Sequence, residues 1–264
     1  MSDAKVPHPC ATAVRSLLRL ALWQTHHGRP DEPAATLQRL EEAAARAATQ
    51  GAHWLVTPEM ALTGYLIEPA ALAARAEPAD GPLAQAVAAI AQRHGIGIVY
   101  GWPERHPQGG QPYNAAQAIG PDGQRLALHR KVHLFGRADA ERFTPGEAVA
   151  APFEWAGTRI GLLICYDVEQ TAAVRALARQ GVQLIIAPTA NMLPYDDAPC
   201  LTVPRLAAEH GVAIAYANAC GAEGGTRYGG LSRLVGPTGA VLASAGRGEV
   251  LLLGNVPVAP GAWV

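Results

Sequence analysis

The sequence has little charge and no excess of either sign. Only 16% of its 264 residues are charged and the formal net charge is -1, which removes the electrostatic case for a nucleic-acid-binding surface. Hydrophobic residues make up 49% of the chain, so the composition also excludes a disordered protein. A chain of this length can bury one large hydrophobic core.

Cysteine is also scarce. The four cysteines are far apart, with no CxxC pair and no nearby paired histidines. This spacing excludes the usual zinc patterns, and it does not resemble a secreted disulfide framework. We therefore expect free thiols, no metal or other cofactor, and a cytoplasmic protein. Two of the cysteines, Cys200 and Cys220, are expected to pack or to lie in loops.

No apolar run is long enough for a transmembrane helix. The N-terminal stretch Ser16–Trp23 is interrupted by Arg19 and is too short to span a bilayer. Glutamine, threonine and two histidines follow it in place of a small-residue cleavage site, which argues against a signal peptide. We expect a flexible arm over residues 1–15, a first core strand over Leu17–Gln24, and no membrane partner.

Strand-like and helix-like segments alternate along most of the chain, which indicates a layered α/β domain. The expected helices are Asp31–Gln50, Pro82–His94, Thr171–Arg179 and Pro204–His210. The expected later strands are His53–Val56, Ile96–Gly101, Tyr113–Ile119, Leu126–Lys131, the run that ends at Cys165, Gln183–Ala187, Val212–Asn218, Leu231–Val235, Val241–Ala245 and Glu249–Val256. Two Gly-Pro-x-Gly turns predict hairpins. With no charged linker and no repeat, we expect a single domain over residues 16–264.

The segment Arg159–Glu169 carries the strongest chemical signal. Its apolar run ends at Cys165 and is followed at once by Tyr166 and Asp167. A thiol at the carboxyl end of a buried strand, beside a helix N-terminus, can become a reactive thiolate. A single unpaired cysteine can equally be a small buried hydrophobe, so this segment alone leaves both interpretations open.

Two other apolar runs also end in a charged residue, one at Glu59 and one at Lys131. Ligand sites gather at the carboxyl ends of strands in α/β sheets, so these residues could meet Cys165 in one pocket. A carboxylate can take the thiol proton and pass it to a leaving amine, and a lysine can lower the pKa of the thiol and stabilise an oxyanion. Taken singly, Glu59 could be an acid at a helix N-terminus and Lys131 a solvated lysine. No catalytic role is assigned to His129 or His133.

The ordered motifs resemble the nitrilase superfamily of carbon–nitrogen hydrolases. The main ones are Pro58-Glu59, RKVHLFG at 130–136, FTPG at 143–146 and GLLICYD at 161–167, in family order within a span from about Leu18 to Val256. The resemblance implies an α/β fold, a four-layer αββα sandwich of two mixed sheets flanked by helices. It also implies Glu59 as general base and acid, Lys131 as oxyanion stabiliser and Cys165 as nucleophile. A homodimer or higher homo-oligomer is implied as well.

The same resemblance implies an accessory acid before the FTPG segment. The matching position is Asp139, with Glu141 as its rival. The backbone N–H of Tyr166 is expected to complete the oxyanion hole, as the residue that opens a helix after the nucleophile. Two further residues, Tyr65 and Asn191, are candidates for the pocket lining. Tyr65 could instead merely pack, and Asn191 could be a turn-former.

These features lead us to expect hydrolysis of a small carboxamide to the carboxylic acid and ammonia, through an acyl-enzyme on Cys165. Water is the second reactant. Nitrile hydrolysis and N-carbamoyl amide hydrolysis are alternatives on the same triad. The alternative from a different class is a redox-active thiol or binding protein on the same fold. The loops around Pro69–Pro78 and Asn191–Pro199 are expected to shape the pocket, but they do not identify the acyl group.

Overall fold

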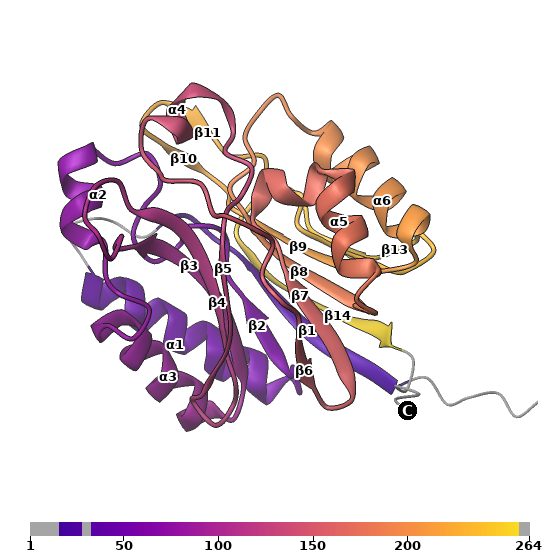
Figure 1. Ribbon diagram of the computed structural model, residues 1–264. Coiled ribbons are helices and arrows are strands. Elements are labelled where there is room, and N and C mark those ends of the chain that lie inside the picture. The colour runs from indigo at the N-terminus through magenta and orange to yellow at the C-terminus, as the bar shows by residue number, and fades with distance from the viewer. Residues whose placement is uncertain (1–15, 28–32, 259–264) are drawn as a thin grey trace, which may run out of the picture.

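The computed structural model describes residues 16–27 and 33–258. Two mixed sheets of six strands each pack face to face with helices outside them, so the predicted αββα sandwich is confirmed (Figure 1). The predicted arm over residues 1–15 and the predicted start of the first helix at Asp31 lie outside the described residues.

The first sheet has the strand order β14-β1-β2-β3-β4-β5. Its strands are β14 (Val250–Val258), β1 (Ser16–Gln24), β2 (Trp54–Val56), β3 (Gly97–Glu104), β4 (Tyr113–Ile119) and β5 (Arg125–Arg130). The three strands β1, β2 and β3 are parallel, and β4 is antiparallel to both β3 and β5. The carboxyl ends of β2 and β5 therefore lie at the same edge of this sheet.

The second sheet has the order β13-β12-β9-β8-β7-β6. Its strands are β13 (Val241–Ser244), β12 (Arg233–Val235), β9 (Ala213–Asn218), β8 (Leu184–Thr189), β7 (Thr158–Leu162) and β6 (Phe153–Trp155). The strands β7, β8 and β9 are parallel at its centre, and the predicted hairpin of β12 and β13 is present.

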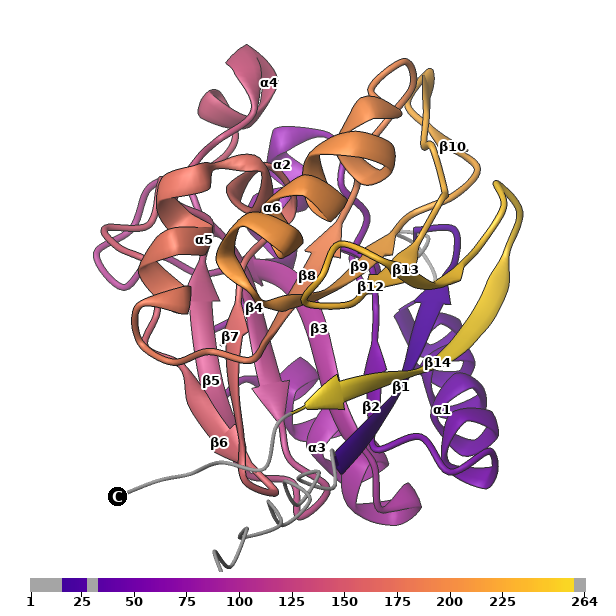
Figure 2. The same ribbon diagram turned by 90° about the vertical axis from the view of Figure 1, so that its right-hand side faces the viewer.

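Helices cover the outer face of each sheet. The helices α1 (Pro33–Thr49) and α3 (Pro82–His94) lie on the first sheet, and α5 (Thr171–Ala178) and α6 (Val203–His210) lie on the second (Figures 1 and 2). In α1 the buried residues Leu40, Ala43, Ala44 and Ala47 recur at helical spacing, which gives the helix one apolar face toward the sheet.

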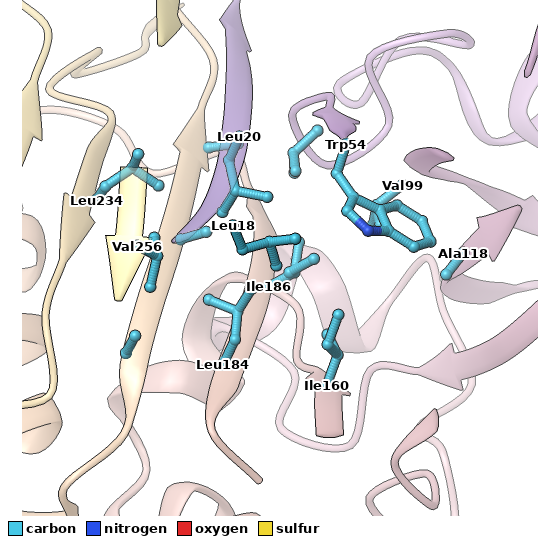
Figure 3. Packing of buried hydrophobic residues seen from close by; sticks show 14 of the residues in the cluster. Leu18, Leu20, Trp54, Val99, Ala118, Ile160, Leu184, Ile186, Leu234 and Val256 are labelled. Carbon is cyan, nitrogen blue, oxygen red and sulfur yellow. The ribbon is translucent and has the colours of Figure 1, made fainter. Parts of the chain in front are cut away.

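The core between the sheets is built from alternate residues of the strands. In β1, Leu20 faces the opposite sheet while Ala21 faces the helices, and in β8 Ile186 and Ile185 divide in the same way. Figure 3 shows side chains of the two sheets meeting in this layer, and all of those labelled are almost completely buried. The labelled residues are Leu18, Leu20, Trp54, Val99, Ala118, Ile160, Leu184, Ile186, Leu234 and Val256.

Several short elements were not predicted. Pro69–Pro78 was expected as a loop, but it contains the helix α2 (Pro69–Arg75), because a proline in the first turn, four alanines and one leucine favour a helix there. The others are α4 (Gly136–Ala140), the 3₁₀ helix η1 (Cys165–Glu169), the π-helix η2 (Ala198–Thr202), β6, β10 (Ala222–Glu223) and β11 (Thr226–Arg227). None of the described helices is long and apolar enough to cross a membrane.

Candidate active site

The candidate site lies where strands of both sheets end. Lys131 directly follows β5, Glu59 lies three residues after β2, and Cys165 lies three residues after β7. The elements α2, α4, β10 and β11 gather near this edge of the sandwich (Figure 1). The backbone N–H of Glu59 donates to the carbonyl of Thr189 at the end of β8, 3.3 Å away. The two sheets are thus joined at the site.

Glu59 and Lys131 form a fully buried ion pair. The Lys131 Nζ lies 2.9 Å from Glu59 Oε1. Asn114 Nδ2 donates to the same oxygen at 2.6 Å, and the backbone N–H of Ala190 donates to Oε2 at 2.9 Å. Both carboxylate oxygens therefore have hydrogen-bond donors, as a buried carboxylate requires.

The structure brings Asp139, and not Glu141, to the lysine. Lys131 Nζ donates to Asp139 Oδ2 at 2.8 Å, and Asp139 also accepts hydrogen bonds from the Tyr65 hydroxyl and the Phe135 backbone N–H. Glu141 lies at the end of α4, is exposed, and pairs with Arg137. Of the two candidate acids, Asp139 is thus the one that contacts Lys131, and its accessory role stays a prediction.

The charge of Lys131 is balanced by two carboxylates. Burial alone would lower the pKa of its ammonium, but Glu59 acts most strongly against this, with a further contribution from Asp139. The pKa of Lys131 therefore lies well above its ordinary value. The lysine remains a cation and can act as a fixed positive charge at the site.

Cys165 opens η1 and lies in a left-handed backbone conformation, with a φ of 47°. Non-glycine residues seldom adopt this region, and such conformations cluster at functional sites. Cys165 is 9% exposed and belongs to a small buried cluster with Ile164 and with Ala116 of β4 in the opposite sheet. The turn therefore places the thiol between the two sheets.

The thiol keeps its proton in this environment. Burial and, after it, the charge of Glu59 raise the pKa of Cys165 well above its ordinary value, while Lys131 and the N–H of Ala190 act in the opposite direction. The expected effect of the lysine is therefore present but outweighed. Because the thiol is protonated, nucleophilic attack requires a base, and Glu59 is the carboxylate whose charge acts on it most strongly.

A cavity of about 30 Å³ adjoins the thiol, enough for roughly one water molecule. The expected lining residues Tyr65 and Asn191 are present, whereas no residue of the segment 69–78 contributes. Tyr166, whose backbone N–H was predicted for the oxyanion hole, also lines the cavity. The Asn191 side-chain amide also donates to the Tyr195 carbonyl at 2.8 Å, so this residue holds the turn as well as lining the cavity. The full lining is Tyr65, Phe135, Cys165, Tyr166, Glu169, Ala190, Asn191, Met192 and Tyr195.

Sequence reasoning missed the role of Asp167, which is fully buried. Its carboxylate accepts hydrogen bonds from His129 Nε2 at 2.9 Å and from His133 Nδ1 at 2.8 Å. Burial alone would raise the pKa of Asp167, but the hydrogen bonds from the histidines outweigh it and hold the pKa below its ordinary value. The two histidines flank Lys131, so Asp167 ties the lysine segment to the cysteine turn. In the sequence, the signal that could have indicated this role is an acidic residue two positions after the cysteine.

Sequence reasoning also missed His27 and Glu223, which hold the backbone of Glu59 in place. His27 Nε2 donates to the backbone carbonyl of Glu59 at 2.9 Å, and its Nδ1 lies 3.3 Å from Glu223 Oε2. Glu223 also accepts from the Tyr65 backbone N–H at 3.0 Å and from the Tyr228 hydroxyl at 2.8 Å. Although burial opposes it, the hydrogen bond and charge of His27 lower the pKa of Glu223 to about 2. No local sequence signal links residues this far apart.

Within residues 16–27 and 33–258, no cluster of three or more histidine, cysteine, aspartate or glutamate side chains is placed to hold a metal ion. The chemistry available at the cavity is that of a thiol, a general base, a fixed ammonium and backbone N–H groups. This set is suited to acyl transfer through a covalent intermediate.

Comparisons with known proteins agree with this geometry. The model of the carbon-nitrogen hydrolase family matches residues 19–259. A hydrolase from Pseudomonas protegens, named after the pqqF 5′ region, is 46% identical over 90% of this chain and 82% of its own length. An (R)-stereoselective amidase from Pseudomonas sp is 35% identical over 84% of this chain and 79% of its own length.

The fold is similar to that of an amidase from Nesterenkonia sp. AN1, with a TM-score of 0.83 and 37% identity over 91% of this chain and 93% of that one. That structure is of a mutant and shows the product of Michael addition of acrylamide at the active-site cysteine. Another mutant of the same amidase was solved in complex with butyramide. The resemblance found in the sequence is thereby confirmed: the chain belongs to the carbon-nitrogen hydrolase family, as an enzyme of the amidase type in the nitrilase superfamily.

Proposed function

We propose that the protein hydrolyses a small primary carboxamide to the carboxylic acid and ammonia, through a thioester on Cys165. The observation that carries the proposal is the buried Glu59 carboxylate, which is paired with Lys131 and acts electrostatically on a protonated thiol beside the cavity. The butyramide complex of the Nesterenkonia amidase supports a small amide as the substrate class.

In the first half-reaction, Glu59 takes the Cys165 proton as the sulfur attacks the carbonyl carbon. The carbonyl oxygen becomes an oxyanion, which the Lys131 ammonium and the backbone N–H of Tyr166 stabilise. The protonated Glu59 then donates to the amide nitrogen, the carbon–nitrogen bond breaks, and ammonia leaves. The acyl group remains on sulfur as a thioester.

In the second half-reaction, water enters the space that ammonia vacated. Glu59 takes one proton from the water, whose oxygen attacks the thioester carbonyl. The carbon–sulfur bond breaks and the carboxylic acid leaves, while Glu59 returns its proton to the sulfur. The enzyme regains its starting protonation state. Asp139 stays paired with Lys131 throughout and holds the ammonium in place.

The test is an ammonia-release assay over small amides, nitriles and N-carbamoyl compounds, with Cys165→Ala as the inactive variant and Cys200→Ala as the matched control. We expect release from amides by the wild type and by Cys200→Ala only. Turnover of nitriles, but not of the matching amides, would contradict the amidase proposal and leave the triad in place. The same holds for turnover confined to N-carbamoyl compounds.

The different-class alternative is a redox-active thiol, which usually needs a resolving cysteine nearby. Among the described cysteines, Cys200 Sγ lies 3.4 Å from Arg233 Nη2, and the pKa of Cys220 responds to burial, Glu249 and Arg39. Neither thiol appears among the groups that act on Cys165. These surroundings favour hydrolysis over thiol exchange. Failure to release ammonia from any class, together with reversible oxidation by peroxide, would reverse this preference.

We also propose that the enzyme is a homodimer or higher homo-oligomer. Several large apolar side chains are exposed on the described surface, among them Leu201 of η2 and Val241 of β13. Exposed apolar groups of this size are candidates for burial between copies. Sedimentation velocity tests the proposal, and a monomer at micromolar concentration would contradict it. The cytoplasmic location stays a prediction.

A further inference from the structure

Glu169 differs from every other carboxylate near the site. It ends η1, lines the cavity beside Cys165 and is half-buried. In the part of the chain that the structure describes, no hydrogen bond or ion pair reaches its side chain. The other acids have dedicated donors: Glu59 and Asp139 share Lys131, and Asp167 and Glu223 each have histidine and backbone N–H groups.

An unpaired carboxylate is unfavourable in such a position, because burial disfavours its charged form. Burial raises the pKa of Glu169, and the charge of Lys131, which is already engaged by two other carboxylates, acts against this. The structure thus holds an acceptor at the cavity for which residues 16–27 and 33–258 supply no donor. A hydrogen-bond donor or a cation on the substrate would pair with the Glu169 carboxylate.

Three aromatic rings lie beside this carboxylate in the lining of the cavity. The Phe135 ring meets those of Tyr166 and Tyr195 edge to face, with centroids 5.2 and 5.3 Å away. Tyr195 is 48% exposed, so this side of the cavity adjoins solvent. Aromatic faces attract cations, most strongly where water is partly excluded. A carboxylate and three aromatic rings make a surface suited to a protonated amine.

We propose that Glu169 and the rings of Phe135, Tyr166 and Tyr195 bind a protonated amine on the substrate while its carboxamide lies at Cys165. This inference rests on the proposed amide hydrolysis and narrows it to amino-substituted small carboxamides. Glu169 and Cys165 are the two ends of one 3₁₀ helix, which separates them by roughly 8 Å at about 2 Å per residue. The amine therefore lies only a few bonds from the carbonyl carbon.

The test uses two amides of equal size, β-alaninamide and butyramide, which differ by an ammonium group in place of a methyl group. For the wild type we expect kcat/KM for β-alaninamide to exceed that for butyramide by about tenfold or more, the size of one charge-assisted hydrogen bond. Glu169→Gln should bring this ratio to about one. Glu141→Gln, an exposed acid outside the site, should keep the wild-type ratio.

A wild-type ratio of one or less would overturn the proposal, and so would an unchanged ratio in Glu169→Gln. An equal fall for both amides would also overturn it, because Glu169 would then contact the carboxamide itself. If the wild type hydrolyses neither amide, the proposed hydrolysis fails, and calorimetric binding to Cys165→Ala decides the inference separately. Tighter binding of β-alaninamide than of butyramide would support it, and equal or weaker binding would overturn it.

Discussion

The two sheets contribute different chemistry to one site. The first supplies the buried charges, with Glu59 after β2 and Lys131 after β5. The second supplies the thiol of Cys165 after β7 and the backbone N–H of Ala190 after β8. Neither sheet carries both the base and the nucleophile, so the packing between the sheets is itself a requirement for catalysis.

The contacts that join the two sheets at the site also differ from ordinary core packing. Most of the interface is aliphatic and non-directional, as in Figure 3. At the site, in contrast, directional polar contacts cross from sheet to sheet: Glu59 with Ala190, and Asp167 with His129 and His133. The aliphatic layer holds the sheets together, and the polar contacts set the relative positions of the reacting groups.

The largest effect is expected from removing the group that only the second sheet supplies. Cys165→Ala should lower kcat/KM by about 10⁴-fold or more, because no covalent intermediate can form. Ammonia release measures the effect, with Cys200→Ala as the control. If Cys165→Ala retained more than a tenth of the activity, the thiol would not be the nucleophile.

Removing the central charge of the first sheet should affect stability as well as rate. Lys131→Met leaves Glu59 and Asp139 buried without their shared cation, which is expected to cost about 3–5 kcal/mol in the free energy of unfolding. Urea denaturation gives the value. The matched control is Arg205→Met on α6, which removes an exposed ion pair with Glu209 and should cost less than about 1 kcal/mol. Equal losses in the two variants would refute the role of the buried charge.

The stabilisation of the fold by Glu223, which helps to hold Glu59 through His27, should depend on pH. Because the folded-state pKa of Glu223 is about 2, below its ordinary 4.5, it stabilises the fold above pH 4.5, and this stability is lost as the pH falls toward 2. The contribution corresponds to roughly 3 kcal/mol. Unfolding of the wild type and of Glu223→Gln should therefore differ most at pH 6 and less at pH 3. A difference that does not change with pH would contradict the assigned pKa.

The smallest effect on stability is expected from weakening the contact of Asp167 with His129 and His133, which joins the two sheets. Asp167→Asn keeps the size of the side chain but removes the charge that accepts from His129 and His133, at an expected cost of about 1–3 kcal/mol in stability. If Asp167 also positions the thiol turn against Lys131, kcat should fall while KM for a small amide changes little. A loss of stability with unchanged kcat would limit Asp167 to a structural role.

Much of the site could be predicted because its residues stand at the ends of apolar runs. Glu59, Lys131 and Cys165 interrupt such runs, and their placement at one edge follows from the parallel strands. The choice between Asp139 and Glu141 could not be made, because it depends on whether the acid within α4 or the acid just after it turns toward the lysine. That orientation is a property of the folded segment and not of residue type.

Glu223 and the short elements could not be predicted from the sequence, for a different reason. Glu223 contacts backbone groups of Tyr65 and Leu66, 157 or more residues away along the chain, and no periodicity records such a contact. The short elements were missed because three-residue strands such as β6 carry no measurable alternation. Long-range polar contacts and very short elements are therefore the parts that only the folded structure reveals.

The contact between Glu59 and Ala190 has a consequence for folding. Base and thiol stand on different sheets, so they meet only once the two layers have docked. Recovery of ammonia release during refolding should therefore lag behind recovery of the helical circular dichroism signal. Enzymatic activity in this molecule therefore shows that the two sheets have packed together, and not only that the helices and strands have formed.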